Sequence, residues 1–423
     1  MLTKLIKYSG IIFAGSTISG IFNFLFMIIM AKLLDPERFG DMIAVISLTV
    51  IVSIPIEIIS NVLTKFVAKY RNSNSYPIDR LVNKLSKLCF TMGILLTVIF
   101  YLLTPIISKF LVISDTKLFY LIGLSFPLAL VSATASGTLY GLHEFYKISV
   151  FSILSTIFKL IFALILIGAG LSTSGVIVGS ILGSYIGYIY IAHQIKVKLE
   201  KISAPNKTSK SNRLHMSQLK TEIITYSKTS LATIILLAIS INADILLTKH
   251  YFNPTTAGHY AALSALGKSI FYLVSPILIA MFPLIAGSSK QQRARSITNL
   301  ALAMIFLATI FILVIFTLIP QFVVKTLFSA SYLPITPYLL PLAIAFVFYA
   351  FARGLTNHFL ALGQRQFVFP LALTTIMQIA LIIIYHSSIT DIVYILMGTN
   401  LFMFASLGIM YKSSLILDNK LVK

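Results

Sequence analysis

Long apolar stretches separated by short polar segments run through this whole sequence and restrict its fold more than any other feature. Hydrophobic residues make up 58% of the chain and charged residues only 11%, whereas a soluble domain has about a quarter charged residues. Inside a bilayer the backbone must satisfy its own hydrogen bonds, so only helices and closed β-barrels span it. The stretches are continuous rather than alternating, which indicates helices. The sequence therefore predicts an all-α integral membrane protein.

Twelve stretches come close to or exceed the length of about twenty residues that a helix needs to cross the bilayer. The first follows Lys4 and Lys7, but it is too long for the core of a signal peptide and no cleavage site follows it, so we expect it to be retained. The predicted spans are Tyr8–Ala31, Met42–Thr64, Leu88–Ser108, Leu118–Leu142, Ile148–Ala169, Gly175–Ile195, Tyr226–Thr248, Tyr260–Ala286, Ile297–Ile319, Tyr338–Leu362, Phe367–Tyr385 and Ile389–Tyr411.

A turn motif follows the first predicted span and recurs after the seventh. The pattern [Asp/Asn]-Pro-x-x-x-Gly-x-x-x-Ala begins at Asp35 and again at Asn253, 218 positions later. Asp or Asn before proline starts a turn, and glycine tolerates backbone angles that other residues resist. A second echo, Gly-x-x-x-Phe, begins at Gly141 and at Gly363, 222 positions apart. Two matches in order near one offset indicate an internal repeat of two tandem halves.

Lysine and arginine residues are distributed unevenly between the two sides of the predicted membrane. Of the 33 such residues, 24 lie on the side of the N-terminus and 6 on the other side, which places both termini in the cytoplasm. Six spans per half give the halves one orientation, so they are parallel repeats. We expect residues 1–195 and 228–423 to form two six-helix halves around a central cavity, joined by a polar cytoplasmic linker at 196–227.

Five charged residues lie inside predicted spans, where hydrocarbon should surround them. They are Glu57, Lys159, Asp244, Lys268 and Arg353, and at the offsets above none has a charged counterpart in the other half. Charges at such depth are costly and normally face a bundle interior or a water-filled cavity. We expect the three cations to face one cavity and bind a ligand. The alternative is structural ion pairing, for example between Asp244 and Lys268 on adjacent spans.

The sequence carries no sign of enzymatic chemistry or of a cofactor. It has no phosphate-binding glycine-rich loop followed by lysine and no His/Cys cluster with metal-ligand spacing. The single cysteine, Cys89, excludes an intramolecular disulfide. The net charge of +21 is divided among segments between apolar stretches, so it does not indicate nucleic-acid binding. We expect a protein that is not an enzyme, with no cofactor and no metal site.

The topology and the first turn together resemble a known family. The run Leu34-Asp35-Pro36-Glu37-Arg38-Phe39-Gly40 after the first span, and Gly141 and Phe145 after the fourth, resemble the Wzx-type polysaccharide flippases of the multidrug/oligosaccharidyl-lipid/polysaccharide exporter superfamily. The second turn departs from the family pattern, with Asn253 and Thr255 in place of Asp and Glu. The resemblance implies movement of undecaprenyl-diphosphate-linked oligosaccharides between the leaflets of the cytoplasmic membrane, by alternating access driven by an ion gradient.

The resemblance also suggests roles for the charged residues inside the spans. Lys159, Lys268 and Arg353 would neutralise the diphosphate and contact the glycan. Glu57 and Asp244 would couple the transport to H⁺ or Na⁺. The implied partners are the lipid-linked oligosaccharide, membrane lipids and other proteins of polysaccharide assembly.

Three other functions remain open at this point. A multidrug or cation antiporter of the same superfamily would need an acidic, aromatic cavity, which three intramembrane cations disfavour. A membrane-embedded polysaccharide polymerase or glycosyltransferase would need a long outer loop or an acidic catalytic pair. A structural or receptor protein would not need five charges inside its spans.

The predicted orientation can be tested by cysteine labelling. A cysteine introduced at Ser211, in the linker, should not react with a membrane-impermeant thiol reagent in intact cells and should react after the cells are permeabilised. Labelling of this cysteine in intact cells would reverse the orientation.

Overall fold

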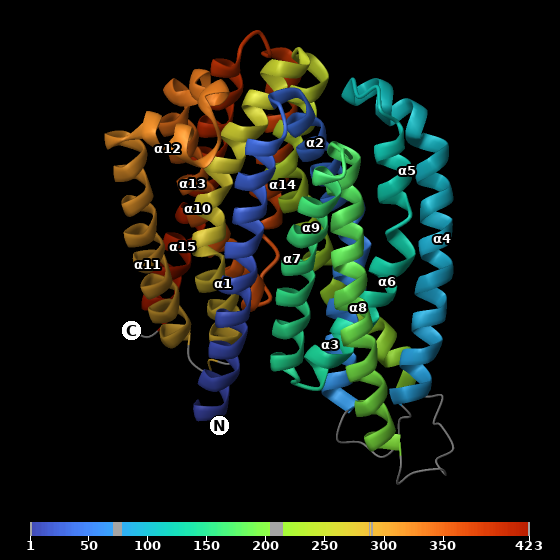
Figure 1. Cartoon of the computed structure of the whole chain (residues 1–423). Helices are drawn as coiled ribbons and strands as arrows, with labels where there is room; N and C mark the ends of the chain where they lie inside the picture. The colour runs from blue at the N-terminus through green and yellow to red at the C-terminus, as the bar shows by residue number, and fades with distance from the viewer. Residues whose placement is uncertain (1, 71–77, 204–214, 287, 289–290, 422–423) are drawn as a thin grey trace. The chain divides into compact units, whose positions relative to one another are not determined.

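The computed structural model of the protein describes residues 2–70, 78–203, 215–286, 288 and 291–421. Within these residues the chain is helical and contains no strand (Figure 1). The centre of the predicted linker, 204–214, lies outside the described residues. The prediction of an all-α membrane protein is confirmed.

Each predicted span coincides with a helix or with a pair of consecutive helices. In the described part of the chain, ten helical segments are long and apolar enough to cross a membrane, and the bent pair α2 and α3 makes eleven. The shorter apolar helix Val368–Ile384 lies at the one remaining predicted span. In chain order the elements are α1 (Leu2–Leu33), α2 (Pro36–Val52), α3 (Ile54–Tyr70), α4 (Ile78–Leu111), α5 (Lys117–Gly123), α6 (Phe126–Gly141), α7 (Phe145–Gly168), α8 (Thr173–Ser203), α9 (His215–Tyr251), α10 (Pro254–Ala286), α11 (Gln291–Leu318), α12 (Pro320–Leu327), η1 (Ala330–Ile335), α13 (Thr336–Ala361), α14 (Val368–Ile384) and α15 (Ile389–Leu421).

Two predicted spans are broken helices. The span predicted at Met42–Thr64 consists of α2 and α3, which meet at Ser53 with a bend of 41°. The span predicted at Leu118–Leu142 consists of α5 and α6. A proline follows each break within two or three residues, and proline removes a helical hydrogen-bond donor and clashes with the preceding turn. Apolar periodicity continues through both breaks, which is why each resembles one helix in the sequence.

The helices group into two compact units that divide the chain at unexpected places. The first unit contains residues 1–26 and 48–231, and the second contains 27–47 and 232–423. The end of α1, the first turn motif and most of α2 thus belong to the same unit as the end of α9 and all of α10 to α15. The second unit therefore contains both copies of the turn motif.

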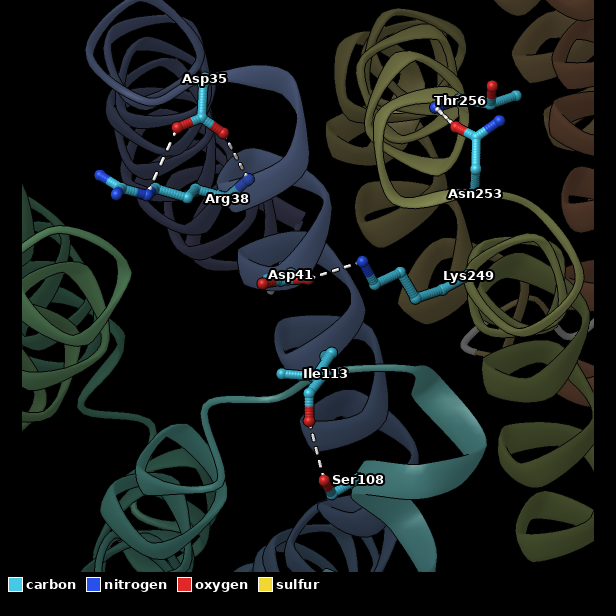
Figure 2. Close-up of polar contacts among 8 residues, drawn as sticks. All are labelled: Asp35, Arg38, Asp41, Ser108, Ile113, Lys249, Asn253 and Thr256. Atoms are coloured by element: carbon cyan, nitrogen blue, oxygen red, sulfur yellow. Dashed lines mark hydrogen bonds and ion pairs between the residues drawn. The ribbon is translucent and has the colours of Figure 1, made fainter.

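The two turn motifs begin their helices in the same way. The Asp35 carboxylate accepts a hydrogen bond from the Arg38 backbone N–H at 2.9 Å, and the Asn253 side-chain oxygen accepts one from the Thr256 backbone N–H at 2.8 Å (Figure 2). Each bond satisfies one of the free donors at a helix N-terminus. In both motifs the proline is the first helical residue, a position where its missing N–H costs nothing. The two copies of the predicted repeat thus share both the capping hydrogen bond and the proline position at this turn.

The motif glycines allow the two turns to contact each other within the second unit. A Cβ atom on Gly258 would lie 1.8 Å from the Pro36 carbonyl oxygen, and one on Gly40 would lie 2.9 Å from the Gly258 Cα. Backbone therefore contacts backbone at this crossing. Beside it, the buried Phe39 ring contacts the rings of Phe328 and Tyr332 edge-on, each with a centroid separation of 6.1 Å.

A buried ion pair joins α2 to α9 next to this crossing. Lys249 Nζ lies 2.6 Å from Asp41 Oδ1 (Figure 2), and the lysine side chain is only 2% exposed. Lys249 directly follows the predicted span Tyr226–Thr248 and is one of the six Lys and Arg residues that the sequence analysis assigned to the side opposite the N-terminus. Its burial makes Asp41 the partner that offsets its desolvation.

The ends of α6 and α13 give the register of the second echo. His143 and Gly363 both have positive φ, at 63° and 71°. The next residue in each half donates its N–H to a carbonyl five residues back, from Glu144 to Leu139 at 2.9 Å and from Gln364 to Phe359 at 3.0 Å. The counterparts are therefore 220 positions apart. The predicted equivalence of Gly141 with Gly363 is wrong by two residues, because histidine occupies the left-handed position in the first half.

Adding a methyl group at the crossing should destabilise the protein. We expect Gly258→Ala to lower the free energy of unfolding by about 1–3 kcal/mol, the usual effect of overpacking. The matched control is Gly398→Ala on α15, where a Cβ meets nothing within 4 Å and the change should stabilise the helix by about 0.5–1 kcal/mol. Thermal denaturation of the detergent-purified variants measures both. Equal effects of the two substitutions would show that the crossing is not tightly packed.

Breaking the buried ion pair should destabilise the protein more than breaking an exposed one. Asp41→Asn leaves the Lys249 ammonium buried without a counter-charge, which should cost about 3–5 kcal/mol. The double variant Asp41→Leu/Lys249→Met should recover most of this stability. The control Arg38→Gln breaks the Asp35–Arg38 pair, whose side chains are 52–58% exposed, and should cost at most about 1 kcal/mol. The same denaturation assay applies, and a loss for Asp41→Asn no larger than that of the control would contradict this account.

Candidate substrate and ion site

Asp244 is a deeply buried carboxylate on α9, only 1% exposed. Its Oδ2 accepts hydrogen bonds from the Tyr260 hydroxyl at 2.8 Å and from the Ser264 hydroxyl at 3.2 Å, both on α10. Its Oδ1 is also buried but has no hydrogen-bond partner among the described residues. One turn further along α9, the buried Thr248 hydroxyl likewise lacks a partner in the described part of the chain. This cluster therefore has unused oxygen ligands that a proton or a small cation could occupy.

Lys268 lies on α10 beside this cluster and is 8% exposed. Its Nζ donates a hydrogen bond to the Asn242 side-chain oxygen at 3.4 Å. It also interacts with the Asp244 charge at longer range, but no ion pair within 4.0 Å joins the two in the part of the chain that the structure describes. The structural alternative from the sequence, a direct Asp244–Lys268 ion pair, is therefore not what the structure contains.

Arg353 provides a second cation in the same unit, on α13. Its guanidinium carbon lies 5.7 Å from the centroid of the Phe271 ring, a cation–π contact. Its Nε is buried and has no hydrogen-bond partner among the residues described. Phe271 comes three residues after Lys268 on α10 and also contacts Tyr349 on α13, with a centroid separation of 5.7 Å. The face of the Phe271 ring thus lies where a carboxylate would neutralise a purely structural arginine.

Lys159 lies on α7 in the first unit. Its Nζ hydrogen-bonds the Asn23 side-chain oxygen on α1 and lies 4.2 Å from the centroid of the Phe26 ring. Glycines on α8 let α7 approach closely, since a Cβ on Gly183 would lie 2.3 Å from the Lys159 backbone nitrogen. Helix packing therefore fixes the backbone of Lys159, while a neutral amide and a ring contact its ammonium group.

The second unit has a polar bridge between the corresponding helices, and no cation of the described residues takes part in it. Gln378 on α14 is fully buried; it donates to the Ser240 carbonyl on α9 at 2.9 Å and accepts from the Ser240 hydroxyl at 3.2 Å. These four donors and acceptors satisfy one another, as stable buried polar groups require. The charge at this bridge is therefore specific to the first half and is not required by the repeated scaffold.

The predicted site residues are divided between the two units. Glu57 is an exposed residue on α3 and, like Lys159, belongs to the first unit. Asp244, Lys268 and Arg353 belong to the second unit, where they share neighbours on α9, α10 and α13. The cavity predicted to be common to all three cations therefore stays a prediction.

Sequence reasoning missed the neutral polar residues around Asp244 and Lys268. Their signal was present, because residues four apart lie on one face of a helix. One buried polar stripe on α9 faces another on α10. The stripes are Ser240, Asp244 and Thr248 on α9, and Tyr260, Ser264 and Lys268 on α10.

Comparison with known proteins agrees with this architecture. A family model described as polysaccharide biosynthesis protein matches residues 5–289. No curated protein matches the sequence. The fold is similar to that of an inward-facing multidrug resistance MATE family transporter of the MOP superfamily, with a TM-score of 0.73 and 14% identity over 93% of this chain and 95% of the other.

Two further solved structures share the fold. The eukaryotic MATE transporter AtDTX14 matches with a TM-score of 0.70 and 13% identity, over 97% of this chain and 95% of that one. A MOP superfamily transporter from Pyrococcus furiosus Vc1 (DSM3638), whose binding pocket is described as having reverse polarity that suggests a different function, matches with a TM-score of 0.65 and 13% identity over the same shares. At these identities the likeness concerns the fold. With the family match covering more than half of its residues, the chain belongs to the polysaccharide biosynthesis protein family and is a membrane transporter of the multidrug/oligosaccharidyl-lipid/polysaccharide exporter superfamily.

Proposed function

We propose that this protein flips undecaprenyl-diphosphate-linked oligosaccharides across the cytoplasmic membrane by alternating access, with both termini in the cytoplasm. The observation that carries the proposal is the presence of intramembrane cations with no carboxylate partner in the described structure: Lys268 and Arg353 in the second unit and Lys159 in the first. The family description, polysaccharide biosynthesis protein, supports the class of substrate.

The cations favour an anionic ligand because charges at this depth are expensive. Insertion into hydrocarbon costs roughly 2.5–3.5 kcal/mol for each Lys or Arg, and neutral partners offset only part of it. A diphosphate would supply the missing negative charge through charge-assisted hydrogen bonds. Arg353 has a free Nε and can present its fork to two phosphate oxygens, while Lys268 acts as a point charge. The lipid tail can meanwhile remain in the bilayer.

The main competing function is a multidrug or cation antiporter of the same superfamily, as the name of one structural relative would suggest. A cationic drug would be repelled by Lys268 and Arg353, which share α10 and α13 with the Phe271–Tyr349 contact. The polarity of the candidate site therefore favours an anion. The transporter from Pyrococcus furiosus, described as differing in function because of the polarity of its pocket, gives a precedent for this reasoning.

Asp244 supplies a way to couple an ion to the substrate. Its Oδ1 and the Thr248 hydroxyl are buried and unpartnered in the described structure, so they can take up H⁺ or Na⁺. A bound cation would neutralise the carboxylate and free the Lys268 charge to attract a diphosphate more strongly. Ion and substrate would then favour each other's binding, and the coupling is reciprocal. Glu57 is the second carboxylate that we assign to ion coupling, in the first unit.

Removing any one of the three cations should strongly reduce transport while the protein still inserts into the membrane. A charge-assisted hydrogen bond contributes about 1.5–3 kcal/mol, so Lys159→Ala, Lys268→Ala and Arg353→Ala should each reduce glycan export roughly tenfold to a hundredfold. Arg353→Lys should recover only part of the activity because the two-pronged geometry is lost. Export is measured in cells lacking the chromosomal copy and divided by the amount of protein in the membrane.

The matched control is Lys325→Ala, which removes an exposed cation on α12 and should leave export per molecule unchanged. A structural role for the three cations gives a different result: the variants would be less abundant, and export per molecule would equal that of the wild type. That result would refute the proposed diphosphate site.

A further inference from the structure

A cavity of about 510 Å³ opens in the first unit, lined by residues of α4, α6 and α8. These three helices contact one another (Figure 1). Its volume falls in the range of roughly 300–1,000 Å³ that is typical of sites for small organic ligands. Apolar side chains form part of its wall, including Val82, Ala135 and Ile195. The polar groups that line it are Asp79, Asn83, Ser86, Thr134, Tyr188 and Lys196.

Polar contacts hold the helices around the cavity in place. The hydroxyls of Ser86 on α4 and Thr134 on α6 hydrogen-bond at 2.8 Å. Near the end of α8, Lys198 forms an ion pair with Glu144 in the α6–α7 loop, and Lys147 approaches the same carboxylate at 3.7 Å. Burial raises the pKa of the Glu144 carboxyl, but the hydrogen bond and charge of Lys198, together with Lys147, outweigh it and hold that pKa below its ordinary value. The Lys198–Glu144 ion pair therefore persists at neutral pH and ties the end of α8 to the α6–α7 loop.

The internal repeat identifies the residues of the second half that correspond to the lining of this cavity. Helices α11, α13 and α15 of the second half correspond to α4, α6 and α8. The starts of α8 and α15 are 216 positions apart, which makes Tyr411 the counterpart of Ile195. The helix-end register of 220 makes His358 the counterpart of Thr138.

In the second half, side chains of α11, α13 and α15 contact one another near the corresponding positions. Pro105 in α4 and Pro320 at the start of α12 are 215 positions apart, so Thr298 and Asn299 on α11 correspond to Asn83 and Lys84. Thr298 hydrogen-bonds the His358 ring at 2.7 Å, the Tyr411 hydroxyl hydrogen-bonds Asn299 at 2.9 Å, and the two rings meet edge-on at 5.0 Å. In the first half the counterpart of Tyr411 is the smaller Ile195, which lines the cavity. The scaffold does not require a cavity here.

The lining of the cavity differs from the cationic site. Asp79 and Lys196 bring opposite charges, and the remaining polar groups are neutral, so a phosphate gains little here. A carboxylate, an amide and hydroxyls instead match the donors and acceptors of a polyhydroxylated ligand, and the Tyr188 ring can cover an apolar sugar face. By the predicted orientation, the start of α4 and the end of α8 are on the cytoplasmic side, where a lipid-linked glycan is made.

We propose that this cavity is a glycan-binding subsite, where sugars of the lipid-linked oligosaccharide dock before they cross the membrane. The inference rests on the proposed flippase function and extends it, since it separates recognition of the sugar from neutralisation of the diphosphate. The subsite would give the transporter selectivity for its glycan, because hydrogen-bonding groups discriminate strongly between hydroxyl patterns.

A protection assay tests the subsite with a probe that lacks lipid and phosphate. The reporter is Ala192→Cys, which lines the cavity, in a Cys89→Ala background that removes the native thiol. The probe is the oligosaccharide released from its lipid by mild acid, taken from cells that carry this gene. It should slow maleimide labelling of the purified, full-length protein at least threefold, whereas maltotriose and sugar-free undecaprenyl diphosphate should not.

The second half supplies the variant that closes the cavity. Ile195→Tyr combined with Lys84→Asn copies the Tyr411–Asn299 pair and should abolish protection by the released oligosaccharide, while Ile195→Leu should keep it. Unchanged labelling in the presence of the released oligosaccharide, with Ile195 in place, would overturn the subsite even if the variants fail to fold.

Co-purification of the intact lipid-linked oligosaccharide, quantified by mass spectrometry on the same preparations, distinguishes the two proposals. If the intact substrate co-purifies but its free glycan gives no protection, the subsite is wrong and the flippase function stands. If neither binds, the proposed function falls and the subsite falls with it.

Discussion

A charge buried inside a membrane protein needs something to offset its lost hydration, and the nature of that partner divides the buried cations of this chain into two kinds. Lys249 has a carboxylate, Asp41, at 2.6 Å, and the pair lies where two backbones cross. Lys268 and Arg353 have only an amide and an aromatic ring as close partners in the described structure. The first arrangement is complete without a ligand. The positive charges of Lys268 and Arg353 are not neutralised in this way and remain available to an anion. The proposed function depends on these two charges.

The internal repeat separates what the fold requires from what the function adds. Equivalent side-chain caps at Asp35 and Asn253 start corresponding helices in both halves, so this chemistry serves the scaffold. At the bridge between a first and a fifth span, one half has a neutral glutamine, Gln378, and the other has Lys159. The first half has a cavity among α4, α6 and α8, whereas in the second half the rings of His358 and Tyr411 meet edge-on between α13 and α15. A duplicated scaffold has thus acquired different chemistry in each copy.

Much of the fold could be predicted from the sequence because the bilayer leaves few choices. The length of the apolar stretches predicted the membrane-spanning helices, and the Asp35-Pro36 pair predicted the turn after the first of them. The break at Ser53 was hidden because apolar residues continue on both sides. The echo at Gly141 was misaligned by two residues, because His143 holds the left-handed position that glycine holds in the other half. Lys249 follows the seventh predicted span and its partner Asp41 lies far away in sequence, so the sequence pattern did not indicate their ion pair. Pairing of this kind depends on tertiary packing, which the sequence pattern does not contain.

The central claim, that this transporter moves lipid-linked oligosaccharides, can be tested directly in proteoliposomes. Undecaprenyl-diphosphate oligosaccharide with a fluorescent tag on its glycan is reconstituted with the purified protein, and a membrane-impermeant quencher is added outside under an imposed H⁺ or Na⁺ gradient. Flipping predicts that the quenched fraction grows beyond the outer leaflet until it includes substrate that began inside. A quenched fraction that stays equal to that of protein-free liposomes, under a gradient of either ion, would contradict the account.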